Sequence, residues 1–242
     1  MRRFWLETVY SLRVLKEIIF PRHCKICEMP IETGYVCECC RKNYLLQRYI
    51  KGIPREEYLA RQAEPLATDI LDNIWLLYKY EGVYKEAIHK IKFANESALL
   101  ALLSEEADMA LPTAKLRWLQ QFDIITSIPT SSERLKQRGF DVPQEIFSSL
   151  CEQRSSCVYI GNVLERVRQT APLYELNPEE RRRELAGCFM LNKNLDVKGK
   201  HILLCDDIFT TGSTLTEAAE VLRCSGASKV SAVALCAAQA NW

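Results

Sequence analysis

A run of acidic, hydroxyl and glycine residues near the carboxyl end of the chain has the chemistry to bind a phosphorylated sugar. Two adjacent carboxylates, Asp206 and Asp207, precede this loop. The loop itself consists of Thr210, Thr211, Gly212, Ser213 and Thr214. Carboxylates accept hydrogen bonds from sugar hydroxyls, and a glycine among hydroxyl side chains lets the backbone approach an anion closely. These residues predict a site that holds a phosphate and a polyol together.

The flanking residues predict a strand before this loop and a helix after it. The apolar run 202–205 is typical of a buried parallel strand, and Leu215, Ala218 and Leu222 follow at helical spacing. The first turn of a helix offers unpaired N–H groups and the positive end of a dipole, and open α/β sheets bind ligands at the carboxyl ends of their strands. We therefore expect an anion site here. An ordinary strand, acidic turn and capped helix is the alternative.

The stretch closely resembles the phosphoribosyl pyrophosphate (PRPP) motif of type I phosphoribosyltransferases. The resemblance implies that Asp206 and Asp207, our candidate catalytic residues, hold the ribose hydroxyls and that residues 210–214 hold the 5′-phosphate. The segment lacks the Gly-x4-Gly-Lys-Ser/Thr pattern of NTPase phosphate loops. Thr210 stands where 6-oxopurine enzymes carry an aspartate that accepts a proton from the base. A threonine hydroxyl is a poor general base near neutral pH, so purine salvage is not implied.

Cysteines near the amino end predict a metal site. Two Cys-x2-Cys pairs, separated by nine residues, are formed by Cys24, Cys27, Cys37 and Cys40. Four thiolates at this spacing can complete a closed, tetrahedral Zn²⁺ site that stabilises the fold. Cys39 and His23 are interpreted as bystanders. A thioredoxin-like redox pair and a metal-free group of buried thiols are the alternatives.

The rest of the chain alternates segments that read as strands and as helices. We expect strands at 74–80, 124–128, 158–160, 188–191 and 229–236, and helices around 87–91, 99–111, 142–150 and before Gly226. This alternation predicts an α/β domain with a mainly parallel sheet flanked by helices. We expect a first domain at 1–65, containing an N-terminal helix, the four-cysteine zinc module and a linker. A phosphoribosyltransferase-like domain is expected at 66–242.

The composition is close to that of an average globular protein. The 242 residues are 48% hydrophobic and 26% charged, and the net charge of +1 argues against a strongly basic nucleic-acid binder. Charged residues interrupt the apolar positions before Pro21, which predicts an amphipathic helix and neither a signal peptide nor a membrane span. We expect a cytoplasmic protein.

A ligand with several phosphates needs cations, and arginine suits bidentate phosphate contacts. Arg134 and Arg138 follow the strand expected at 124–128 and are our candidates for PRPP binding. Further arginines surround a stretch near Pro172 and Pro178 that reads as a loop: Arg166, Arg168, Arg181, Arg182 and Arg183. The basic residues of the helix around 87–91 are interpreted as a solvated face: Lys85, His89, Lys90 and Lys92.

Taken together, the motifs occur in the order seen in the ComF family of competence proteins. They are the two cysteine pairs, Tyr80-Glu-Gly82, Lys92-Phe93, Arg138-Gly-Phe140, Arg166-x-Arg168 and the PRPP loop. The resemblance covers nearly the whole chain, although Asp141 follows Arg-Gly-Phe where asparagine is usual.

The resemblance implies a zinc knuckle joined to a phosphoribosyltransferase domain that binds PRPP with Mg²⁺. It further implies handling of single-stranded DNA during natural transformation, with DNA-uptake or helicase proteins as partners and transfer to an unspecified acceptor. A non-catalytic adaptor that binds nucleic acid or senses PRPP on the same scaffold is the alternative function.

Overall fold

A computed structural model describes residues 22–46, 48–54, 70–111, 115–151, 157–168 and 178–238. The helix expected before Pro21 lies outside these residues. Within the described part of the chain, no helix has the length and apolar character needed to cross a membrane.

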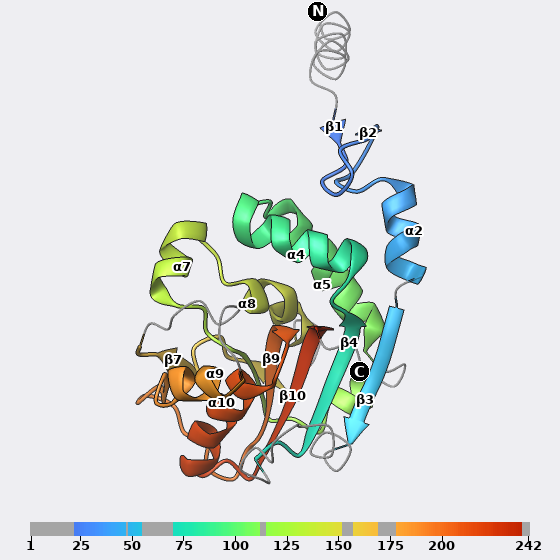
Figure 1. The fold of residues 1–242 in the computed structure, drawn as a ribbon. Helices are drawn as coiled ribbons and strands as arrows, with labels where there is room; N and C mark the ends of the chain where they lie inside the picture. Colours follow the sequence, from blue (N-terminus) through green and yellow to red (C-terminus); the bar gives the residue numbers. More distant parts are fainter. Residues whose placement is uncertain are drawn as a thin grey trace, which may run out of the picture.

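Within the described residues, six strands form the central sheet (Figure 1). In spatial order they are β3 (Arg48–Pro54), β4 (Asn73–Lys79), β10 (Lys229–Ala237), β9 (His201–Phe209), β5 (Ile124–Ser127) and β6 (Val158–Tyr159). The five strands from β4 to β6 pair in parallel, and β3 adds to β4 in antiparallel orientation. The predicted α/β fold with a mainly parallel sheet is confirmed.

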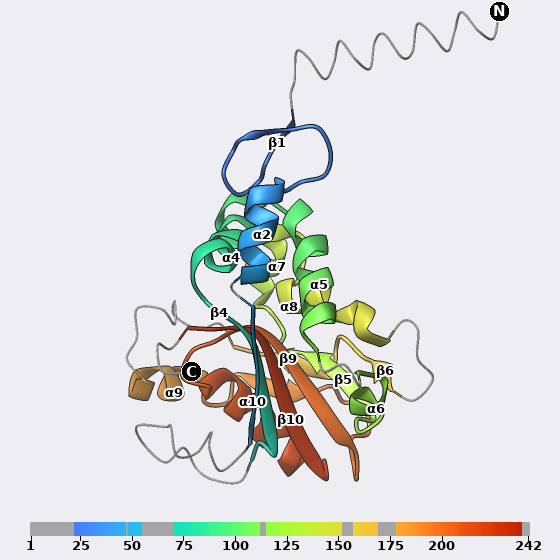
Figure 2. The same ribbon diagram turned by 90° about the vertical axis from the view of Figure 1, so that its right-hand side faces the viewer.

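Helices cover both faces of this sheet (Figure 2). The helices are α2 (Glu38–Leu46), α4 (Gly82–Ala94), α5 (Ala98–Ala110), α6 (Lys115–Leu119), α7 (Ser132–Arg138), α8 (Val142–Phe147), α9 (Pro178–Leu185) and α10 (Ser213–Cys224). Apolar residues of α4, α5 and α8 pack with Leu203 and Cys205 on one face, and those of α10 pack with Ile202 and Leu204 on the other. Because both faces are buried, β9 reads as a continuous apolar run.

The described residues also form two small two-stranded antiparallel sheets. Strands β1 (Arg22–His23) and β2 (Pro30–Ile31) belong to the cysteine module, and β7 (Leu164–Arg166) pairs with β8 (Phe189–Leu191) beside the main sheet. Figure 1 shows the cysteine module at the end of the molecule toward which the parallel strands point.

The prediction of a linker in the first domain is wrong at one place. The expected linker contains β3, an edge strand, where Gly52 and Pro54 are tolerated because one side of an edge strand needs no backbone hydrogen bonds to another strand. The stretch interpreted as a loop lies outside the described residues up to 177, and α9 begins at Pro178, since proline suits the first turn of a helix. The division between residues 65 and 66 stays a prediction, although β3 joins part of the first segment to the main sheet.

Candidate functional site

Strand β9 carries the acidic pair to the carboxyl edge of the sheet. The strand continues through Asp206 and Asp207 to Phe209, so both carboxylates sit on rigid sheet backbone. The Asp207 side chain is only 8% exposed, and Asp206 is half-buried. The backbone N–H of Asp207 donates to Oδ1 of Asp206 at 2.8 Å. The two acids are therefore held close together in a largely buried place.

Burial raises the pKa of Asp206 well above its usual range, and the negative charge of Asp207 raises it further. The ammonium group of Lys92 acts in the opposite direction. Two adjacent carboxylates away from water repel each other unless a cation or a proton reduces their charge. The acidic pair therefore favours a ligand that brings a cation or hydrogen-bond donors.

Lys92 reaches the acidic pair from α4. Its Nζ lies 2.6 Å from Oδ2 of Asp207, and its side chain is 22% exposed. Lys90 is also turned toward protein, because its Nζ donates to the backbone oxygen of Ile26 at 3.0 Å. The interpretation of a solvated basic face is therefore wrong for Lys90 and Lys92, although Lys85 and His89 are exposed. The periodicity of one helix does not show which other segments pack around it.

The predicted phosphate loop forms one tight turn between β9 and α10. Gly212 has a φ of 80°, in the left-handed region that favours glycine, and Ser213 begins the helix. Thr211 Oγ1 lies 2.8 Å from Ser213 Oγ, while Thr211 and Thr214 remain half-buried. Gly212 has no side chain that could cap α10, and the first N–H of the helix, that of Ser213, donates to Oγ1 of Thr211 at 3.5 Å. The turn has the N–H groups and hydroxyls that a phosphate needs.

The two predicted PRPP-binding arginines lie on α7, which follows β5. Arg138 donates from Nε to the backbone oxygen of Lys92 at 2.9 Å and is half-buried, whereas Arg134 is exposed. Burial lowers the pKa of Arg138, as does the charge of Arg134, while the charges of Asp207 and Asp141 raise it. The structure thus brings Arg138 to the acidic pair, with Arg134 one helical turn away.

Asp141 ties the residues that follow β5 to the first turn of α8. Its carboxylate accepts hydrogen bonds from the backbone N–H groups of Thr130 at 2.7 Å and Gln144 at 3.2 Å. The two N–H groups donate to different oxygens, Oδ2 and Oδ1, so the asparagine usual at this position could accept only one of these bonds through its single carbonyl oxygen. The aspartate accepts both and adds a negative charge. Burial raises the pKa of Asp141, although these two N–H groups oppose the shift.

The second arginine cluster divides into two parts. Arg168 donates from Nη2 to the backbone oxygens of Glu184 and Ala186, so it holds the end of α9. Arg166 lies over the ring of Phe189, with Cζ 5.7 Å from the ring centroid. Burial lowers the pKa of Arg166, as does the positive charge of Arg134, while the negative charge of Asp206 raises it. Arg166 is therefore a further cation near the acidic pair.

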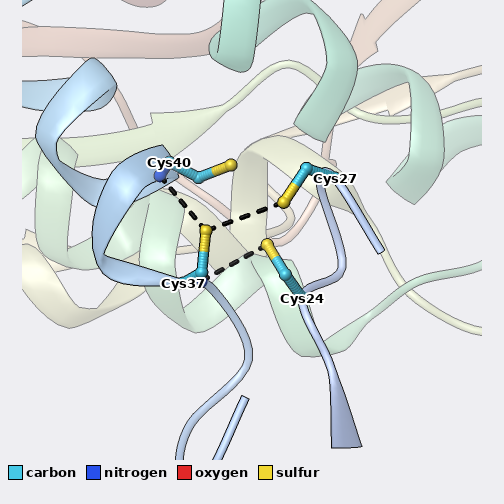
Figure 3. Close-up of side chains that lie close together, drawn as sticks. All are labelled: Cys24, Cys27, Cys37 and Cys40. Atoms are coloured by element: carbon cyan, nitrogen blue, oxygen red, sulfur yellow. Dashed lines mark hydrogen bonds between the residues drawn. The ribbon is translucent and has the colours of Figure 1, made fainter. Parts of the chain in front are cut away.

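The four cysteines form a compact group at the other predicted site (Figure 3). Their Sγ atoms all lie within 4.8 Å of one another, and those of Cys27 and Cys37 are 3.6 Å apart. Tetrahedral Zn²⁺ with Zn–S bonds of about 2.3 Å places sulfurs about 3.8 Å apart. The cysteine geometry fits a structural zinc site, and Cys39 is exposed outside the group.

Backbone N–H groups favour the thiolate form of Cys24, although burial and the neighbouring cysteines raise the pKa of Cys40. The N–H of Cys37 donates to Sγ of Cys24, and that of Cys40 donates to Sγ of Cys37, both at 3.3 Å. Burial raises the pKa of Cys24, but hydrogen bonds from backbone N–H groups outweigh it and bring the pKa to about 6. Since the thiolate is the form that binds metal, this arrangement suits Zn²⁺.

The cysteine module packs on the helix that carries Lys92. Ile26, between the first two cysteines, is buried in the same apolar cluster as residues of α4. Lys25 forms an ion pair with Glu96 at 3.1 Å, just beyond the end of α4, and Lys90 binds the backbone of Ile26. The module and the acidic pair therefore contact different sides of one helix.

Comparison with known proteins agrees with this geometry. Residues 153–242 match the family model described as a phosphoribosyl transferase domain, which includes the loop and α10. The DNA utilization protein YhgH of Salmonella typhimurium is 35% identical over 153 residues, which are 62% of this chain and 65% of that protein. The YhgH protein of Escherichia coli K12 is 28% identical and matches 89% of this chain and 97% of its own.

A third relative, together with the cysteine cluster, identifies the family. The competence protein ComFC of Bacillus subtilis is 27% identical over 202 residues, which are 78% of this chain and 72% of that protein. The chain belongs to the ComF family. Its phosphoribosyltransferase-type sheet and cysteine module are the two parts expected of this family.

Solved structures include a hypoxanthine phosphoribosyltransferase of Staphylococcus aureus. It aligns with a TM-score of 0.33 at 12% identity, over 59% of this chain and 64% of that one.

Lys92 and Arg166 of this ComF-family chain were not among the predicted site residues. Both stood in recognised motifs, Lys92-Phe93 and Arg166-x-Arg168, and those motifs were the available signal. Their charge alone could not separate them from solvated lysines and arginines, because the ion pair of Lys92 with Asp207 and the electrostatic interaction of Arg166 with Asp206 depend on the fold.

Proposed function

We propose that this ComF-family protein binds PRPP with Mg²⁺ at the carboxyl edge of β9 and supports the handling of single-stranded DNA in competence. The observation that carries the proposal is the acidic pair on β9, followed at once by the glycine turn at the start of α10. This spacing allows a ribose and its 5′-phosphate to be held in one place. A cytoplasmic location and partners among DNA-uptake or helicase proteins belong to the same proposal.

Different residues bind different parts of the ligand. Asp206 and Asp207 accept hydrogen bonds from the ribose hydroxyls, and the turn from Thr210 to Thr214 donates to the 5′-phosphate. Arg138, which contacts the backbone beside the acidic pair, offers a cation for the pyrophosphate, with Arg134 nearby. Mg²⁺ prefers oxygen ligands, and when bound it supplies positive charge that stabilises the departing pyrophosphate. Transfer to an acceptor would make the protein a phosphoribosyltransferase.

Calorimetry with PRPP and Mg²⁺ tests the proposal. We expect Asp207→Ala to abolish binding, because it removes a carboxylate expected to hold the ribose. Asp196→Ala is the matched control, since Asp196 is an exposed carboxylate in the loop before β9. Equal affinity in wild type and Asp207→Ala would refute the ribose assignment. Pyrophosphate release with a panel of bases, amines and oligonucleotides then separates a transferase from a PRPP sensor.

A specific observation favours the nucleic-acid-binding alternative. Phe93 is 68% exposed on α4, next to Lys92, and its ring lies 4.7 Å from that of His89. Exposed aromatic rings near cations can stack with bases of single strands. A DNA-binding adaptor predicts affinity for an oligonucleotide that falls steeply with salt, weakens in Phe93→Ala and persists in Asp207→Ala.

A further inference from the structure

Lys92 is a cation that the fold, and not the local sequence, delivers to the acidic pair. It comes from the last turn of α4, while Asp207 lies on β9. Their contact of 2.6 Å joins two largely buried groups, the lysine 22% and the aspartate 8% exposed. Ion pairs on open surfaces contribute little, but removing one partner of a buried pair leaves an uncompensated charge. This contact is therefore more than a surface ion pair.

The arrangement fixes one oxygen of Asp207 and not the other. Lys92 contacts Oδ2, and Oδ1 takes no part in this ion pair. A carboxylate has two oxygens that together accept about four hydrogen bonds, so a lysine on one oxygen does not prevent a hydroxyl from binding the other. The backbone of Lys92 is itself held, because its carbonyl accepts the hydrogen bond from Arg138. Lys92 is thus held at its backbone by Arg138 and at its ammonium group by Asp207.

The charges around the pair show what Lys92 offsets. The titratable groups that interact with Asp207 come from several elements packed around it. They are Asp206 on β9, Lys92 on α4, Arg138 on α7, Asp141 at α8, Tyr80 after β4 and Cys236 on β10. Burial, and next the charge of Asp207, raise the pKa of both Tyr80 and Cys236, so these two are neutral near neutral pH. Without Lys92, Asp206 and Asp141 would face Asp207 with Arg138 as the cation that acts on Asp207, while Arg166 acts on Asp206.

We propose that Lys92 is a positioning residue whose ammonium group holds the carboxylate of Asp207 in place through Oδ2, leaving Oδ1 to accept a ribose hydroxyl. The inference rests on the proposed binding of PRPP. Lys92 then acts through Asp207 and does not itself contact the reacting atoms. A lysine in this role makes the site competent before any Mg²⁺ arrives.

The test compares Lys92→Met with Lys92→Arg and with the control Lys85→Met. Lys85 is an exposed lysine on the same helix, so its replacement matches the chemical change away from the acids. Calorimetry with PRPP and Mg²⁺ is run from about pH 6 to about pH 8.5, on both sides of neutrality, because burial and the charge of Asp207 raise the pKa of Asp206. Circular dichroism and thermal unfolding establish that each variant folds.

We expect Lys92→Met to weaken binding about tenfold or more at neutral pH, with recovery as the pH rises. The affinity of Lys92→Met should recover with rising pH because loss of the cation makes the acidic pair easier to protonate, and higher pH restores the negative charge of the pair. Lys92→Arg and Lys85→Met should bind as wild type does. Equal affinity of Lys92→Met and wild type at every pH would overturn the proposal, as would a loss that does not change with pH.

A second readout does not depend on PRPP. Carbon NMR of labelled aspartate carboxyls follows the ionisation of Asp206 and Asp207, with Asp206→Asn used for assignment. We expect Lys92→Met to raise the midpoint of the pair, and an unchanged midpoint contradicts the role of Lys92. If wild type fails to bind PRPP while the midpoint rises, the proposed function fails and the role of Lys92 beside the acidic pair stands.

Discussion

Replacing Gly212 by alanine probes the backbone of the phosphate turn. Gly212 has a φ of 80°, and an L-residue in left-handed backbone costs about 1–2 kcal/mol. A side chain at this position also leaves less room for an anion to approach the backbone closely. We expect the unfolding free energy to fall by about 1–2 kcal/mol, and binding of PRPP to be lost in addition.

The control for this change is Gly199→Ala. Gly199 has a φ of 72°, a Cβ added there would meet no atom within 4 Å, and the residue lies in the loop before β9. The backbone cost should therefore be similar, while PRPP affinity stays as in wild type. Urea unfolding measures the first quantity and calorimetry the second. If Gly212→Ala binds PRPP as tightly as Gly199→Ala does, the assignment of the phosphate to this turn is refuted.

Three further predictions concern the cysteine module and the acids. Cys37→Ser should reduce zinc below one ion per chain, measured by elemental analysis, and should unfold the module while the main sheet stays folded; full zinc content would contradict the four-cysteine site. Lys90→Met should speed amide hydrogen exchange around Ile26, because it removes the hydrogen bond that ties the module to α4. Unchanged exchange would show that the bond contributes little. Asp206→Asn should raise the unfolding free energy at neutral pH and weaken PRPP binding. Burial raises the pKa of Asp206 in the folded protein, so the wild-type protein loses stability as the pH rises from the unfolded pKa of this carboxyl through its folded pKa. An amide does not titrate, so the variant keeps that stability. Equal pH dependence of urea unfolding in both proteins would contradict this.

The parts of the site that were predictable are those whose chemistry is local in the chain. The phosphate turn and the four cysteines have their residues a few positions apart, so spacing alone indicates a geometry. The fold class was predictable because buried strands and amphipathic helices have different apolar periods.

The remaining features depend on contacts between distant segments. Lys92 looks like its exposed neighbour Lys85 in sequence, and only the packing of α4 beside β9 separates them. Strand β3 contains Gly52 and Pro54, which usually end strands, and it exists because β4 offers an edge. Pro178 opens a helix here, although the same residue also marks loops.

Amide NMR of the wild-type protein, titrated with PRPP and Mg²⁺, tests the central claim most directly. The proposed site predicts that the signals of Asp206, Asp207 and the turn from Thr210 to Thr214 shift together with the signals of the first residues of α10. Shifts confined to other parts of the chain, or none at saturating PRPP, would contradict the assignment of this turn as the site of a phosphorylated ribose.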